Sequence, residues 1–120
     1  MQRGPLKLKM QLVCGSLFAM GPGKAELLEA IAREGSISAA GRAMGMSYRK
    51  AWVLVDEMNH CFTAALVETI SGGGKQRGAR LTETGARALA AFRAIEAEAA
   101  EVAKGPDYAE LVALLRDEPG

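Results

Sequence analysis

Two consecutive helices joined by a very short turn are the feature that most constrains the fold of this chain. Ser36 is a good N-cap for a short helix over Ile37–Met44, and Ser47 is a good N-cap for a longer helix over Tyr48–Phe62. Gly45 between them suits the left-handed conformation that ends a helix. A short helix, a glycine-containing turn and a second helix form a helix-turn-helix unit.

Side-chain size and periodicity support close packing of these two helices. The first helix is rich in small residues, which allow another helix to approach closely: Ala39, Ala40, Gly41 and Ala43. The second helix has apolar residues at helical spacing on one face: Ala51, Leu54, Val55, Met58 and Phe62. We expect that face to point into the core.

The other elements are predicted from hydrophobic periodicity and from glycine and proline breaks. They are a strand over Leu6–Phe18 with a bend at Gly15, a helix over Lys24–Arg33, strands over Leu66–Ile70 and Ala79–Leu81, a helix from Thr82 or Thr84 to Lys104, and a final short helix. The two later strands flank a glycine-rich, basic tip and predict a β-hairpin. The expected fold is mainly α with a small β-hairpin sheet: a winged helix-turn-helix (residues 1–84) with a C-terminal helical dimerisation extension (residues 85–120).

The long helix carries an apolar stripe that the rest of a chain of 120 residues cannot fully cover. The stripe follows heptad spacing and comprises Phe92, Ile95, Ala99 and Val102. A second copy of the chain is the cover we expect, which predicts a homodimer. The alternative is that the final helix folds back over the stripe with its own apolar residues, Tyr108, Leu111, Val112 and Leu115.

Two cations at the start of the second helix of the unit point to an anionic partner. Arg49 and Lys50 lie where the helix dipole disfavours positive charge, by roughly 0.3–1 kcal/mol each. Recognition helices enter the DNA major groove with their N-terminal residues leading, which explains such a placement. We expect Arg49 to contact guanine, and Lys50 and Tyr48 to hold phosphates. The alternative is that the two cations are merely solvated on an exposed turn.

The hairpin tip supplies a second group of candidate DNA contacts. Its cations stand among glycines that let the backbone approach a ligand closely: Lys75, Arg77 and Arg80. Charge is also uneven along the chain, because residues 1–90 carry 12 Lys/Arg and 7 Asp/Glu, a net +5, whereas residues 91–120 carry 3 and 7, a net −4. A basic front and an acidic tail fit double-stranded DNA as the partner of the front.

Other classes of function find little support in the sequence. The single histidine, His60, and the cysteines Cys14 and Cys61 form no zinc-site spacing, and we expect both thiols to be small buried hydrophobes. The glycine runs lack the GxxxxGK[ST] pattern of a phosphate-binding loop, and no nucleophile stands beside a base. No apolar run is long enough to cross a membrane. We therefore expect a cytoplasmic protein that is not an enzyme, with no cofactor or metal.

Residues 26–60 resemble the N-terminal domain of the ModE-type molybdate-responsive regulators. The resemblance rests on the run Gly35–Ser38, the run Ser47–Trp52, the segment Leu66–Glu68, the glycine-rich basic tip and the run Leu81–Gly85, in that order and spacing. It covers about residues 6–104, and the Gly-Ser-Ile-Ser run alone is shared with LysR-type regulators. The resemblance implies a winged-helix dimer, with dimer contacts from the strand, the first helix and the long helix. It also implies DNA contacts from the wing and from Ser47, Tyr48, Arg49 and Lys50. We further expect Ser36 and Ser38 to contact DNA.

The resemblance does not extend to ligand sensing. Full-length members of that family bind molybdate in C-terminal β-barrel domains, and this sequence has no strand-rich segment after Lys104. We therefore expect a transcriptional regulator that binds a palindromic operator as a dimer without binding molybdate directly, either constitutively or through a separate sensor protein. The alternatives are a winged-helix protein-interaction module and a non-specific architectural DNA binder.

Overall fold

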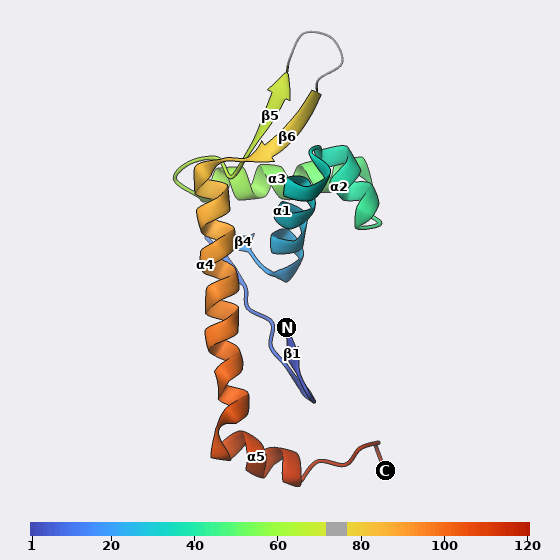
Figure 1. The fold of residues 1–120 in the computed structure, drawn as a ribbon, viewed down its shortest axis with the longest axis vertical. Coiled ribbons are helices and arrows are strands. Elements are labelled where there is room, and N and C mark those ends of the chain that lie inside the picture. The colour runs from blue at the N-terminus through green and yellow to red at the C-terminus, as the bar shows by residue number, and fades with distance from the viewer. Residues whose placement is uncertain (72–76) are drawn as a thin grey trace.

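The computed structural model describes residues 1–71 and 77–120 of the chain (Figure 1). Its elements, in order, are β1 (Gln2–Arg3), β2 (Leu6–Lys7), β3 (Leu12–Cys14), β4 (Leu17–Met20), α1 (Pro22–Glu34), α2 (Ile37–Ala43), α3 (Tyr48–Cys61), β5 (Val67–Ser71), β6 (Arg77–Leu81), α4 (Glu83–Ala100), the 3-10 helix η1 (Glu101–Lys104) and α5 (Pro106–Ala113). The predicted fold class, a mainly helical winged helix-turn-helix with small two-stranded sheets, is confirmed.

The helix-turn-helix unit forms as predicted, and its local capping explains why. The Ser36 hydroxyl accepts a hydrogen bond from the Ala39 N–H at 3.0 Å, and the Ser47 hydroxyl accepts one from the Lys50 N–H at 3.1 Å. Gly45 has a φ of +69°, as the turn requires. Both helices end within one residue of the predicted position.

Gly41 allows α2 and α3 to cross at close range. A Cβ at this position would lie 3.2 Å from the Ala51 Cβ and 3.6 Å from the Met46 side chain. Both Gly41 and Ala51 are buried. Ala40 and Gly41 therefore have the packing role predicted for the small residues of α2, whereas Ala39 is half-buried and Ala43 is exposed.

The predicted single strand over Leu6–Phe18 is wrong, because the N-terminal segment folds into two hairpins. β1 pairs antiparallel with β2, and β3 pairs antiparallel with β4. Gly4 and Gly15 have φ values of +53° and +58°, which fits tight reversals between such strands. The alternation of apolar and polar residues indicated extended backbone correctly, but a glycine inside a strand pattern fits a bend and a reversal equally well.

The wing is the hairpin of β5 and β6, paired in register from Val67 opposite Leu81 to Ser71 opposite Arg77. Its base is fixed to the helices by backbone hydrogen bonds. The Ala79 N–H donates to the Gly35 carbonyl at 2.9 Å, in the turn between α1 and α2. The predicted hairpin is confirmed, and it rises beyond the helix-turn-helix unit at one end of the molecule (Figure 1).

One continuous core joins the three N-terminal helices, the wing base and α4. Its fully buried large side chains are Met20, Leu27, Leu28, Ile31, Val55, Met58 and Leu66, and Phe92 of α4 packs against them. The predicted inward positions Ala51, Val55 and Met58 of α3 are buried, whereas Leu54 and Phe62 are half-buried at its edge. This core holds α3 with one face inward and the opposite face outward.

The long helix α4 runs along the 61 Å dimension of the molecule, with the wing at one end and α5 at the other (Figure 1). The Thr82 hydroxyl caps it by accepting from the Gly85 N–H at 3.0 Å. Helical structure continues through η1 and ends before Gly105, as predicted.

The fold-back of α5 over the apolar stripe of α4 does not occur. Ile95 and Val102 of the stripe are exposed, as are Leu111 and Leu115 of the final helix. The Tyr108 hydroxyl instead donates a hydrogen bond to the Arg3 carbonyl of the first hairpin at 3.1 Å. Gly105 and Pro106 break the helix, so α5 runs away from the stripe.

The prediction that both cysteines are small buried hydrophobes is wrong. Cys14 is exposed and Cys61 is half-buried, and both are free thiols. The physical reason is the unpredicted reversal at Gly15, which places Cys14 at the end of a hairpin strand instead of inside a longer strand. No helix in the described residues is long and apolar enough to cross a membrane.

Candidate nucleic-acid interface

The first turn of α3 projects from the body of the molecule with its polar residues free to meet a ligand. Tyr48, Arg49 and Lys50 are exposed, and the core contacts of the helix begin at Ala51. The first turn contains no acidic residue. Within residues 1–71 and 77–120, neither Arg49 nor Lys50 forms an ion pair, so their charges are not neutralised there. This arrangement suits a ligand that carries negative charge.

Helix geometry assigns different directions to these side chains. Successive residues of an α-helix are about 100° apart, so Arg49 lies about 160° from Ala51 and points directly away from the core. Tyr48 and Lys50 lie on opposite flanks of that outward row. One turn of α3 therefore carries a central side chain that points straight outward, Arg49, and one side chain on each side of it, Tyr48 and Lys50.

A hollow of about 450 Å³ separates this turn from the wing and joins three elements. Ser36 and Ser38 line it from the start of α2, and Tyr48 and Trp52 line it from α3. Thr69, Ile70, Ser71, Gly78 and Ala79 line it from the wing. Of the predicted residues, Ser36, Ser38 and Tyr48 thus share this hollow, whereas Ser47, Arg49 and Lys50 do not line it.

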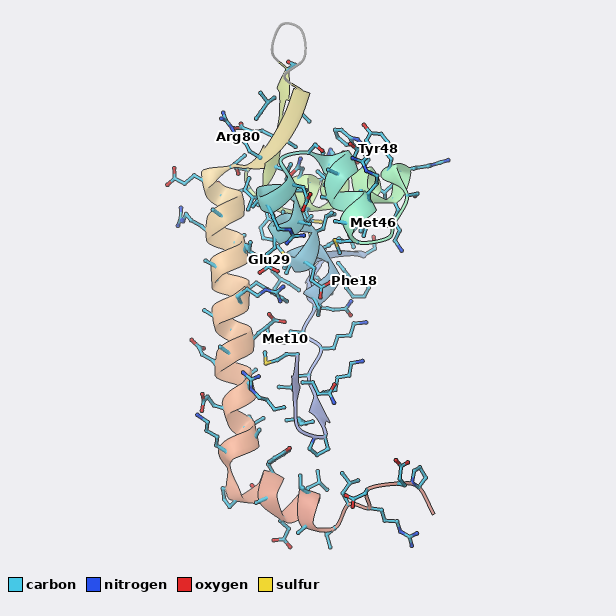
Figure 2. The ribbon with its side chains drawn as sticks, turned by 45° about the vertical axis from the view of Figure 1, so that its right-hand side comes forward. Met10, Phe18, Glu29, Met46, Tyr48 and Arg80 are labelled. Carbon is cyan, nitrogen blue, oxygen red and sulfur yellow. The ribbon has the colours of Figure 1, made fainter. Side chains whose placement is uncertain are left out.

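Of the three predicted wing cations, Arg80 is the one whose side chain the structure describes. Arg80 lies opposite Glu68 in the hairpin, and its Nε donates to the Glu68 Oε1 at 2.6 Å. Ala79 next to it is buried against the helices, so Arg80 extends from the other face of the hairpin, on the side away from Tyr48 (Figure 2). The structure therefore does not bring Arg80 together with the α3 residues. Lys75 and the side chain of Arg77 lie outside the described part of the chain.

Two lysines of the N-terminal segment extend the basic surface on the other flank of α3. Lys7 and Lys9 line a second hollow, of about 680 Å³, together with Lys50. Lys24 lies in the same wall, but Glu57 neutralises it at 3.2 Å and the Phe18 carbonyl accepts a hydrogen bond from it. Lys7 and Lys9 were not predicted as DNA contacts, because the alternating pattern placed them on a strand with no indicated contact to the helix-turn-helix unit.

Asn59 is a further positioning residue that the sequence did not reveal. Its Oδ1 accepts from the Leu66 N–H at 2.9 Å and the Val67 N–H at 3.1 Å, and its amide donates to the Val67 carbonyl at 3.1 Å. These bonds join the last turn of α3 to the first residue of the wing. Nothing in the sequence marks Asn59, because its partners become visible only when the chain has folded.

Trp52 lies in the wall of the hollow between α3 and the wing, one helical turn after Tyr48. It packs edge-to-face against Tyr48, with ring centroids 6.1 Å apart and an interplanar angle of 73°. Its indole N–H has no hydrogen-bond partner among the described residues, and the ring lies at the surface of the hollow.

No group of three or more metal-ligating side chains occurs in the described residues.

Comparison with known proteins gives a family match over the helix-turn-helix region. Residues 23–86 match the bacterial regulatory helix-turn-helix proteins of the lysR family. The molybdenum-pterin-binding protein MopB of Rhodobacter capsulatus is 46% identical over 83 residues, 69% of this chain and 31% of that protein. The molybdenum transport protein ModE of Azotobacter vinelandii is 41% identical over 80 residues, 67% of this chain and 30% of that protein. The DNA-binding transcriptional dual regulator ModE of Escherichia coli K12 is 37% identical over 113 residues, 92% of this chain and 42% of that protein.

Solved structures agree on the fold. The CbnR_DBD-DNA complex superposes with a TM-score of 0.54 at 21% identity, covering 76% of this chain and 95% of that chain. Full-length LysG of Corynebacterium glutamicum superposes with a TM-score of 0.52 at 26% identity, covering 83% of this chain and 31% of that chain. The chain spans less than half the length of the three curated relatives.

Proposed function

The chain belongs to the bacterial regulatory helix-turn-helix proteins of the lysR family, and on that premise we propose that it is a sequence-specific DNA-binding transcriptional regulator of the ModE type. In this proposal α3 enters the major groove and the wing follows the DNA backbone. The partner is double-stranded DNA, which places the protein in the cytoplasm of a bacterium, and no catalytic role is assigned to the chain.

One observation carries the proposal: the outward-facing first turn of α3, with Arg49 at its centre and Tyr48 and Lys50 on its flanks. Arg49 suits a bidentate contact to guanine, and Lys50 suits a phosphate. Ser36, Ser38 and Ser47 stand beside this turn and have hydroxyls for phosphate contacts, although Ser36 and Ser47 also cap their helices. Lys75, Arg77 and Arg80 remain the proposed wing contacts.

The proposal includes a homodimer formed through residues 85–120, with residues 1–84 binding DNA. It is supported by the apolar residues that α4 and η1 leave exposed, Ile95 and Val102. A dimer with two-fold symmetry presents two recognition helices and prefers a palindrome, with half-sites about 34 Å apart or a multiple of that distance.

We further propose that residues 1–120 do not bind molybdate directly, although the regulated process concerns molybdenum. The names of the relatives support a regulated process that concerns molybdenum. The family match lies on the helix-turn-helix region, which supports the absence of direct molybdate binding. We propose a separate sensor protein as one route by which molybdate could act on residues 1–120.

Selection of bound duplexes from a random DNA pool, with and without molybdate at near-physiological salt, tests the proposal. We expect a palindrome to be enriched equally in both conditions. Enrichment of no sequence, with binding that weakens steeply as salt rises, would identify an architectural DNA binder instead. No binding at all would favour a protein-interaction module, and molybdate-dependent enrichment would contradict the absence of direct sensing.

Two variants then assign the contacts on the selected duplex. Arg49→Ala should cost roughly 1–3 kcal/mol of binding free energy and relax the preference at one base position. Lys75→Ala should weaken binding to all sequences about equally and reduce the dependence on salt. If Arg49→Ala leaves both affinity and preference unchanged, α3 does not read bases in the proposed register.

A further inference from the structure

An apolar patch is exposed at the centre of the candidate DNA interface. It consists of Tyr48, Trp52, Val53 and Ile70, whose exposed fractions are 57%, 36%, 50% and 38%. Between Ala19 and Ala94, these four are the only large apolar side chains that the described residues expose. Tyr48, Trp52 and Ile70 line one hollow, and Val53 lies next to Trp52 on the outward side of α3. Apolar residues scattered singly over a surface need no explanation, but apolar side chains gathered around one hollow indicate an apolar contact there.

Val53 occupies the outermost position of this patch. It follows Arg49 by one helical turn and lies on the side of α3 opposite the buried residues Ala51 and Val55. Its neighbour Trp52 is held against Tyr48 by the edge-to-face contact at 6.1 Å. A stiff β-branched side chain therefore projects where the helix would meet the floor of a groove, beside a fixed aromatic pair.

We propose that Val53 determines sequence specificity by contacting the 5-methyl group of a thymine in the major groove, with Trp52 and Tyr48 enclosing that contact on one side. The inference rests on the proposed function. On the major-groove edges of the four bases, the thymine methyl is the apolar feature that a side chain without polar atoms can read. Arg49 and Val53 are four residues apart, about 6 Å along the helix axis, and successive base pairs are about 3.4 Å apart, so the thymine lies about two base pairs from the base that Arg49 contacts.

The test replaces each thymine of the selected duplex, one at a time, by deoxyuridine, which lacks the methyl group and keeps the hydrogen-bonding edge. We expect one position per half-site at which this change lowers the affinity of the wild-type chain by about three- to tenfold, the effect of exposing one buried methyl group. Val53→Ala should bind the thymine and deoxyuridine duplexes equally at that position.

Ile70→Ala is the matched control, because it removes apolar surface from the same patch on a different element and should keep the penalty at that position. Unfolding midpoints of both variants should equal that of the wild type, since both side chains are exposed.

The outcomes separate the two proposals. Specific binding with no position sensitive to deoxyuridine, or a penalty that survives Val53→Ala, overturns the inference and leaves the proposed function intact. Failure to select any duplex overturns the proposed function and the inference together.

Discussion

At the scale of single residues, the Asn59 side chain joins the last turn of α3 to the start of the wing. The amide groups that it satisfies belong to Leu66 and Val67, which are buried. A buried N–H without an acceptor costs about 1–3 kcal/mol. Asn59 therefore stabilises the fold and sets where the wing starts relative to α3.

We expect Asn59→Ala to lower the free energy of unfolding by about 1–3 kcal/mol, as measured by urea denaturation. Asn59→Asp is the matched control, because it keeps an acceptor for the two N–H groups and loses the donor to the Val67 carbonyl. It should lose less stability than the alanine variant at neutral pH. Equal stability of Asn59→Ala and wild type would show that water replaces the amide at no cost.

Arg93 of α4 binds two carboxylates, Glu29 of α1 and Glu96 of its own helix, and the first of these links α4 to α1. Its Nη2 lies 2.7 Å from Glu29 Oε1, and its Nη1 lies 2.7 Å from Glu96 Oε1, whose side chain is buried. The hydrogen bond from Arg93 holds the pKa of Glu29 below its usual value, against a smaller opposing effect of burial. A carboxyl whose pKa is lowered by folding contributes stability above its unfolded pKa, and this contribution is lost as pH falls through the folded pKa.

We therefore expect the wild-type chain to lose stability as pH falls below about 4.5, the ordinary pKa of this carboxyl. Glu29→Gln should show a shallower loss over the same range, with a cost at pH 7 below about 1 kcal/mol, because the pair is partly exposed to solvent. Urea denaturation between pH 3 and pH 7 measures both slopes. Parallel slopes for the two proteins would assign the acid sensitivity to other carboxyls.

At the scale of elements, Gly85 sets how closely α4 approaches the wing. A Cβ at this position would lie 2.0 Å from the Leu66 carbonyl oxygen, so either α4 or the wing base must move if it is present. The Thr82 N–H donates to the same carbonyl at 2.9 Å. Glycine is needed here for a close approach of two backbones, although its own conformation is helical.

We expect Gly85→Ala to destabilise the fold by more than 1 kcal/mol, on the order of the overpacking cost of a buried site. Gly23→Ala in α1 is the matched control, because a Cβ there meets nothing within 4 Å. It should be neutral or stabilising by up to about 1 kcal/mol, since alanine favours a helix over glycine. Thermal unfolding of the two variants gives the comparison, and a Gly85→Ala chain as stable as Gly23→Ala would contradict the close approach.

The elements that could be predicted from the sequence are those defined by local chemistry. Ser36, Gly45 and Ser47 mark the limits of α2 and α3 within a residue, because caps and turns depend on a few neighbouring atoms. The N-terminal hairpins could not be predicted, because alternation does not say whether a strand continues or reverses at Gly15. The ion pair between Arg80 and Glu68 could not be predicted either, because it depends on the register of the two wing strands.

At the scale of the whole molecule, the helix-turn-helix unit and the wing lie at one end and a largely uncovered apolar surface runs along α4. A hollow of about 400 Å³ in this surface is lined by Met10 and Leu12 of the N-terminal segment and by Phe92 and Ile95 of α4. These residues come from segments far apart in the sequence, so the heptad pattern predicted only the part of this surface that α4 contributes. This surface lies at a distance from the candidate interface, so the proposed dimer would leave the candidate interfaces of both copies free.

We expect Ile95→Glu to convert the proposed dimer into a monomer without unfolding it. The Ile95 side chain is 51% exposed in the single chain, so a carboxylate there is solvated in the monomer but desolvated when a second copy covers it. Leu114→Glu makes a similar change immediately after α5, at a side chain that is 77% exposed and lies outside the hollow, and should leave the dimer intact. Sedimentation equilibrium measures the mass of each variant, and circular dichroism confirms the fold. A wild-type chain of monomer mass, or a dimer that survives Ile95→Glu, would show that α4 is not the interface, and palindromic binding would then require contacts made only on DNA.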